Sequence, residues 1–198
     1  MYWRAELLLL KPLFVDMFQE LIKALPNAVI FAVLASLLLL HRKRSFMPLF
    51  SNWAGSFKQK AFRKWFYLFL YAGLLLSVTL FTRDYQPQPF KAVIGKWFLK
   101  YRSGFWHHGN IENILLFMPL CPLVLGNFCN GDHAGNCLWK GTLLSVITTL
   151  LIEVVQAVLH RGTFQLSDLF FNTVGGMIGL VCFIIWRIVW QRKNTFRK

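Results

Sequence analysis

Acidic residues are scarce in this sequence of 198 residues: eight Asp and Glu stand against 22 Lys and Arg, which gives a formal net charge of +14. At the same time, 56% of the residues are hydrophobic. A soluble protein of this composition would expose too much apolar surface, and no nucleic-acid-binding motif accompanies the positive charge. A bilayer accounts for both properties, because it takes up apolar runs while anionic head groups attract cations. We therefore expect a membrane protein with no nucleic-acid partner.

Several other signals are absent. The four cysteines, two of them inside predicted membrane spans, do not form the pattern of a disulfide framework. The N-terminus lacks the layout and cleavage site of a removable signal peptide, so we expect the first span to be retained. No glycine-rich phosphate loop, nucleophilic serine motif, internal repeat or low-complexity tract is present. We therefore predict a single membrane domain over residues 1–198.

Long apolar windows dominate the sequence. A helix that spans a bilayer needs about 20 largely apolar residues. Residues 1–20 mix Leu and Phe with five charged side chains, which indicates an interfacial N-terminal segment, with a sixth span as the alternative. We predict an all-α fold, a polytopic transmembrane helical bundle of about five spans plus interfacial amphipathic helices. The predicted spans are residues 21–40, 65–81, 111–128, 141–159 and 169–190.

Lysine and arginine predict the orientation of this bundle, because cytoplasmic segments of membrane proteins are enriched in them. Twelve of these cations lie in the 41–64 connection, at Lys140 and in the tail after Trp190, and eight lie in the segments on the other side. We therefore expect a multi-pass protein with its N-terminus outside and its C-terminus in the cytoplasm.

The connection before the third span is both basic and apolar. Apolar side chains recur at helical spacing at Phe90, Val93, Ile94, Trp97, Phe98 and Tyr101. The cations fall away from that face at Lys91, Lys96, Lys100 and Arg102. We predict a basic amphipathic helix that lies in the membrane interface. It either seals the rim of the bundle or gathers anionic head groups, which makes membrane lipids the expected partners.

Three acids lie within or beside apolar windows. Glu112 opens the third span, Glu153 lies past the middle of the fourth, and Asp168 immediately precedes the fifth. A charged carboxylate at the bilayer centre costs at least ~2.5–3.5 kcal/mol on insertion scales, so each is a candidate functional residue. Because successive helices alternate in direction, all three are expected in the outer half of the bilayer.

Helical spacing brings further polar residues to this level. Thr149, Glu153, Gln156 and His160 share one stripe of the fourth span. Asp168 and Asn172 lie one turn apart on the fifth span and are expected to face Glu153 and Gln156, with Arg161 in the turn as counter-charge. Glu112 and Asn113 close the group from the third span. We call this set the polar cluster: Glu112, Asn113, Glu153, Gln156, Arg161, Asp168 and Asn172.

Glycine and proline shape the helices around the polar cluster. Gly175, Gly176 and Gly179 continue the face of Asn172 and predict that the fifth span approaches a neighbour closely. Pro119 and Pro122 predict a kink in the third span.

Three roles remain open for the polar cluster. It fixes helix order as an internal network, or it binds a polar head group, with Arg161 and His160 facing phosphate and the carboxylates facing amine or hydroxyl groups. The third role is catalysis, with Glu153 as general base or as a metal ligand beside Asp168. No spacing matches a metal motif such as HExxH, and Cys129, His133 and Cys137 lack the fourth ligand and spacing of a zinc site. We expect neither a metal nor a cofactor.

The stretches 112–125 and 148–180 resemble the VanZ-like family of bacterial membrane proteins. The family pattern is Asn-Ile-hydrophobic-Phe-x-Pro-Leu in one helix, followed by Glu-x-x-Gln, Arg-Gly and Asp-x-x-x-Asn-Thr-x-Gly-Gly-x-x-Gly. The matching residues are Asn113, Phe117, Pro119, Glu153, Gln156, Arg161, Gly162, Asp168, Asn172, Thr173, Gly175, Gly176 and Gly179. The resemblance places a VanZ-like core at residues 85–198. It departs at Cys121, where the family usually has Gly, and at Gln165 and Ser167, where acids are frequent.

The resemblance implies a plasma-membrane protein of the bacterial cell envelope that lowers susceptibility to teicoplanin-type lipoglycopeptides. Combined with the polar cluster, it favours a non-enzymatic protein that binds a lipid-linked or amphiphilic ligand in the outer leaflet. The alternative is a small membrane enzyme that acts on a lipid head group or polyprenyl phosphate. Transport is a third hypothesis, against which the small number of spans and the lack of an inverted repeat argue.

Overall fold

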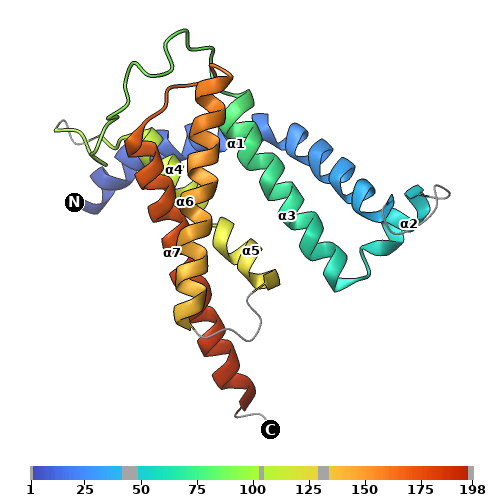
Figure 1. Ribbon diagram of the computed structural model, residues 1–198. Helices are drawn as coiled ribbons and strands as arrows, with labels where there is room; N and C mark the ends of the chain where they lie inside the picture. Colours follow the sequence, from blue (N-terminus) through green and yellow to red (C-terminus); the bar gives the residue numbers. More distant parts are fainter. Residues whose placement is uncertain (1, 42–48, 103–104, 129–133, 196–198) are drawn as a thin grey trace. The chain divides into compact units, whose positions relative to one another are not determined.

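The computed structural model describes residues 2–41, 49–102, 105–128 and 134–195 (Figure 1). Within these ranges the chain forms helices and two isolated β-bridges but no strand, which confirms the all-α prediction. In chain order the elements are α1 (Tyr2–His41), α2 (Leu49–Ser56), α3 (Lys60–Leu76), the π-helix η1 (Ser77–Phe81), α4 (His108–Phe117), α5 (Leu120–Phe128), α6 (Ala134–Val158) and α7 (Leu166–Thr195).

Five helical segments of the described chain are long and apolar enough to cross a membrane. Each overlaps one predicted window, so the prediction of about five spans is confirmed. The observed segments are Lys11–Leu40, Lys60–Phe81, His108–Leu125, Gly135–Val158 and Leu166–Val189. Helix α1 begins at Tyr2 and continues through the first span without a break, so residues 2–20 belong to the same helix as the first span.

The chain divides into two compact units, Met1–Val15 with Tyr85–Lys198, and Asp16–Asp84. In the second unit, small residues line the inner face of α1: Ala24, Ala28 and Ala32 are all fully buried. A Cβ added to Gly73 of α3 would lie 3.0 Å from backbone atoms of Ala28. These small side chains therefore permit the close contact of α1 with α3, as is common between helices in lipid.

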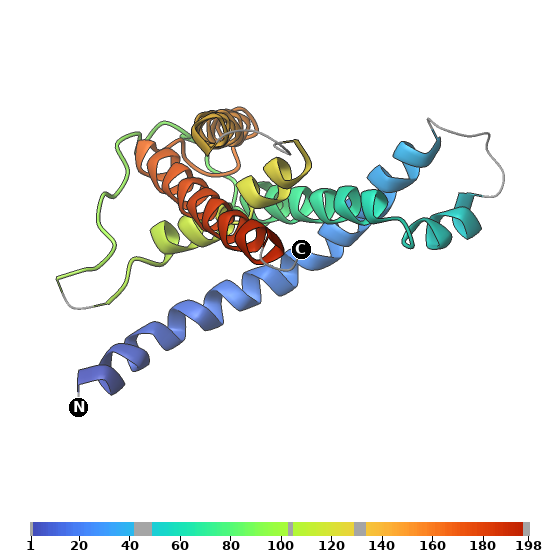
Figure 2. The same ribbon diagram turned by 90° about the horizontal axis from the view of Figure 1, so that it is seen from below.

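The first unit contains the VanZ-like stretches, and its helices pack around α7. Helix α7 contacts α4, α5 and α6, and Figure 2 views α6 nearly along its axis with α7 beside it. The third span is divided where α4 ends at Phe117 and α5 begins at Leu120, because Pro119 lacks the N–H that a continuous helix needs. The predicted kink is thus found as a helix break.

An irregular segment connects the second and third spans and is described at residues 85–102 and 105–107; the name 85–107 segment refers to these residues. Figure 2 shows its described part looping out beside the helices. The prediction of an amphipathic helix over residues 90–102 is wrong, because only a turn at 89–94 forms there. Pro87 and Pro89 disfavour helical geometry in Gln86 and Gln88, so no helix leads into residues 90–102 from the preceding chain. Gly95 has a φ of 71°, which ends any helical path. The apolar residues do recur at helical spacing, but the local backbone conformation prevents a helix.

Candidate functional site

The polar cluster is organised by the tight turn that joins α6 to α7. The Arg161 N–H donates to the Gln156 carbonyl at 2.9 Å, and His160 and Gly162 have φ values of 54° and 112°. Glycine is required at 162 because L side chains rarely adopt that conformation. His160 follows the end of α6 at Val158, so it does not continue the predicted helical stripe. Its Nδ1 lies 3.1 Å from the Gln86 carbonyl oxygen instead.

The predicted stripe of α6 is buried up to Gln156. Thr149, Glu153 and Gln156 are each less than 5% exposed. The N–H of Gln165, at the end of the turn, donates to Oε2 of Glu153 at 3.0 Å. Glu153 therefore ties α6 to the first residues before α7. Sequence reasoning missed this contact because the donor is a backbone group of Gln165, which no residue type reveals.

Asn172 joins the two helices one turn deeper. Its Nδ2 donates to the Thr149 hydroxyl at 2.8 Å, in a buried position. Its Oδ1 is buried and has no hydrogen-bond partner among the described residues. A buried polar atom left without a partner costs about 1–3 kcal/mol. Among the described residues of the polar cluster, this amide oxygen is a fully buried acceptor that lacks a partner.

The remaining members of the polar cluster occupy different environments. Asn113 of α4 is buried and Glu112 is half-buried. Asp168 lies in the first turn of α7, half-buried, where the helix N-terminus favours negative charge. Arg161 is exposed at the turn. The buried members thus come from the helices, and the arginine lies at the rim.

The three glycines of α7 contact two different helices. A Cβ added to Gly175 would clash with the Ile114 carbonyl, and one added to Gly179 with the Met118 carbonyl, so both glycines face the third span. A Cβ on Gly176 would clash with the Ser145 hydroxyl of α6. Close packing on two sides therefore holds α7 between α4 and α6.

Two further residues anchor the 85–107 segment over this end of the helices. Asn110 is 1% exposed, and its Nδ2 donates to the carbonyls of Lys96 and Phe98, both at 2.8 Å. The Lys96 N–H donates to the Ser167 hydroxyl at 3.1 Å. The sequence marks Ser167 only as a departure from the family pattern, and sequence reasoning does not identify Asn110. The one feature of the sequence that could have pointed to Asn110 is its position beside the start of an apolar window.

His107 begins α4 as its N-cap. Its Nδ1 accepts a hydrogen bond from the Asn110 N–H at 3.3 Å, which requires an unprotonated nitrogen. Burial, and then the positive charge of Lys96, hold the pKa of His107 below its ordinary value of 6.5. Both the geometry and the charge therefore favour the neutral ring.

The structure offers little for metal binding in the part that it describes. No group of three or more His, Cys, Asp or Glu side chains is placed there to hold a metal ion. Cys129 and His133 of the weak zinc hypothesis lie outside the described residues. Cys137 is fully buried, and its Sγ accepts a hydrogen bond from the Arg187 guanidinium at 3.6 Å.

Comparison with known proteins agrees with the motif analysis. A family model described as VanZ/LLP1 matches residues 45–187, more than two thirds of the chain. The matched region includes all the polar cluster and all three α7 glycines. Comparisons with curated proteins and with solved structures each find no match.

Proposed function

The chain is a multi-pass membrane protein of the VanZ/LLP1 family, and from this premise we propose that its polar cluster binds the head group of a lipid-linked or amphiphilic ligand. The observation that carries the proposal is the unpartnered Oδ1 of Asn172, in a residue only 3% exposed. A network that served only to fix helix order would gain by satisfying that atom. A ligand hydroxyl or amine would satisfy it.

The chemistry of the buried groups indicates what kind of head group fits. The Asn172 amide oxygen and the Glu153 carboxyl are acceptors, so the inner part of the ligand carries hydrogen-bond donors, such as sugar hydroxyls or an amine. The exposed guanidinium of Arg161 lies at the turn, where a phosphate on the same ligand would find a planar cationic partner. A phosphate-containing amphiphile with hydroxyl or amine groups meets both requirements.

The membrane supplies the route of access in this proposal. The outward face of α6 is apolar and exposed, with Leu151 60% exposed and Val154 45% exposed. These residues face away from the buried stripe of Thr149, Glu153 and Gln156, so one side of α6 contacts lipid. We propose that an amphiphile in the bilayer reaches the polar cluster at the turn, where Arg161 is exposed. We place the cluster in the outer leaflet of a bacterial plasma membrane, with the C-terminus in the cytoplasm.

Binding of a lipid-linked or amphiphilic molecule in the outer leaflet would change what the envelope exposes to antibiotics. We therefore propose that the protein lowers susceptibility to teicoplanin-type lipoglycopeptides, as its family membership suggests. Expression in a susceptible Gram-positive host should raise the minimum inhibitory concentration of teicoplanin and leave that of a ribosome-targeting antibiotic unchanged. Asn172→Ala should abolish the increase at equal membrane abundance. An unchanged concentration with the wild-type protein would exclude this role.

Thr173→Ala is the matched control for that experiment. The Thr173 hydroxyl donates to the Leu169 carbonyl at 2.8 Å within its own helix. The substitution therefore removes a hydroxyl next to Asn172 and leaves the hydrogen bonds of the polar cluster unchanged. The control should behave as the wild type.

The alternative function is a small membrane enzyme acting on a lipid head group or polyprenyl phosphate. What favours it is the fixed orientation of Glu153, whose Oε2 is held by the Gln165 N–H at 3.0 Å. A carboxylate held in this way could act as a general base. Glu153→Gln keeps an acceptor oxygen but removes the base. Retention of full function by that variant, at equal expression, would exclude catalysis by Glu153.

A further inference from the structure

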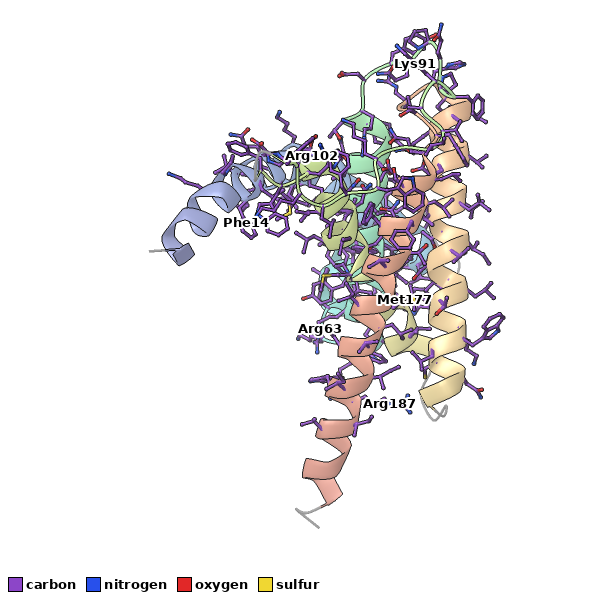
Figure 3. All side chains as sticks on the ribbon, turned by 90° about the vertical axis from the view of Figure 1, so that its left-hand side faces the viewer. Phe14, Arg63, Lys91, Arg102, Met177 and Arg187 are labelled. Atoms are coloured by element: carbon purple, nitrogen blue, oxygen red, sulfur yellow. The ribbon has the colours of Figure 1, made fainter. Side chains whose placement is uncertain are left out.

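A second surface of this protein lies in the 85–107 segment, away from the interior of the polar cluster. Between Asp84 and Glu112 the sequence contains no acid but four lysines and arginines. All four side chains are exposed, namely Lys91, Lys96, Lys100 and Arg102. Figure 3 shows Lys91 and Arg102 at the end of the helices where α7 begins, with Arg187 towards the other end of α7. The segment therefore carries four exposed cations and no acid of its own.

The same segment exposes apolar and aromatic side chains between its cations. Phe90, Ile94, Trp97 and Phe105 are all more than half exposed. The indole N–H of Trp97 donates to the Ile94 carbonyl at 2.8 Å, so its polar group is satisfied while the ring stays accessible. Aromatic side chains whose polar group is hydrogen-bonded to protein or to water favour the head-group region of a bilayer.

The backbone that carries these side chains is held at defined points. The Asn110 amide binds two carbonyls of the segment, and Ser167 binds the Lys96 N–H. The Phe164 N–H donates to the Pro89 carbonyl, and the Leu166 N–H to the Val93 carbonyl, both at 2.8 Å. The cations are therefore presented from a folded scaffold, and little ordering is needed when a ligand binds.

We propose that the 85–107 segment is a docking surface for anionic phospholipid head groups. It follows Phe81, where the second apolar span ends, and leads into His108, where the third begins, so it lies at the depth of the head groups. Four cations without an acid complement phosphodiester charge, and the interleaved aromatic rings enter the acyl boundary. A soluble acidic partner would match the charge but not the exposed rings.

This inference does not depend on the proposed function. The lipid binds here through phosphate charge at the surface, whereas the polar cluster takes hydrogen-bond donors at a buried site. Either site can be lost while the other remains.

The experiment is lipid photo-crosslinking of the full-length protein in vesicles of phosphatidylcholine with a minority of phosphatidylglycerol. The photoreactive residue p-benzoylphenylalanine replaces either Phe105 or Leu151, which are 52% and 60% exposed. At Leu151, on the lipid-facing side of α6, the share of phosphatidylglycerol in the crosslinks should equal its share of the bilayer. At Phe105 it should be several-fold higher, and high salt should lower it.

Charge-removing and charge-retaining variants then identify the groups responsible. Changing Lys91, Lys96, Lys100 and Arg102 together to Gln should reduce the Phe105 enrichment to the value at Leu151. Changing the three lysines to Arg keeps the charge and should keep the enrichment. Equal lipid shares at Phe105 and Leu151 in the otherwise unchanged protein would overturn the proposal, as would enrichment that is insensitive to both salt and the Gln changes.

Discussion

The backbone N–H of Gln165 donates a hydrogen bond to the Glu153 carboxyl across the turn between α6 and α7, at 3.0 Å. Glu153 is 2% exposed and Gln165 is half-buried, so the carboxyl end of this bond is shielded from water. It couples a buried carboxyl group of α6 to the chain that begins α7. The packing of the hairpin and the chemistry of the polar cluster thus depend on the same carboxyl group.

This relationship predicts different outcomes for two substitutions of Glu153. Glu153→Ala leaves the N–H of the half-buried Gln165 without this acceptor, which costs about 1 kcal/mol. Glu153→Gln keeps an acceptor oxygen and should cost less. The measurement is thermal unfolding of the purified variants in detergent, where the Ala variant should unfold at the lower temperature. Equal unfolding temperatures would contradict the role given to this hydrogen bond.

The close contact of α7 with the third span predicts the effect of Gly175→Ala. The added Cβ would clash with the Ile114 carbonyl, a backbone atom that cannot rotate away. We expect a loss of about 1–3 kcal/mol, as for other overpacked contacts, and lower yield of folded protein. Gly135→Ala on α6 is the control, because a Cβ there meets no atom within 4 Å. If both variants were equally stable, the close contact would not contribute to packing.

The two hydrogen bonds of the Asn110 amide predict slow amide hydrogen exchange in the part of the 85–107 segment that they hold. Asn110→Asp keeps the shape of the side chain but replaces the amide donor with an acceptor facing the carbonyls of Lys96 and Phe98. Amide hydrogen exchange of residues 95–101 should become faster, while exchange within α6 should stay as in the wild type. Unchanged exchange in the segment would show that other contacts hold it.

The neutral cap at His107 predicts a pH dependence. Its lowered pKa means that the folded chain binds fewer protons than the unfolded chain below pH 6.5. The stabilisation is therefore complete above that pH and is lost as the pH falls from 6.5 through the folded pKa. We expect the unfolding temperature to decrease on acidification by a smaller amount in His107→Asn, because Asn caps a helix without titrating. An equal decrease in the unfolding temperatures of the wild type and His107→Asn would show that other titratable groups cause the pH dependence.

The parts of the fold that follow from hydropathy could be predicted from the sequence. Apolar windows of bilayer length located the five spans, and Pro119 located the break in the third. Helical spacing also placed Thr149, Glu153 and Gln156 on one buried face of α6, because that spacing is a property of the helix itself.

Backbone conformation and backbone hydrogen bonds could not be predicted in the same way. The apolar spacing of residues 90–102 indicated a helix, but Gly95 adopts a positive φ and the Asn110 amide captures two carbonyls there. The departure of His160 from the α6 stripe has a similar cause, since its φ of 54° belongs to the turn. In both places a tertiary contact or a special dihedral angle overrides the pattern of side chains.

The central claim is that the polar cluster binds a head group that donates hydrogen bonds to Asn172, and native mass spectrometry tests it most directly. The full-length protein, purified in mild detergent from bacterial membranes, is compared with the Asn172→Ala and Thr173→Ala variants. We predict that the wild type and Thr173→Ala retain the same amphiphile, with a hydroxyl- or amine-bearing head group, and that Asn172→Ala does not. A wild-type protein with no retained amphiphile, or retention at equal occupancy in all three proteins, would contradict the claim.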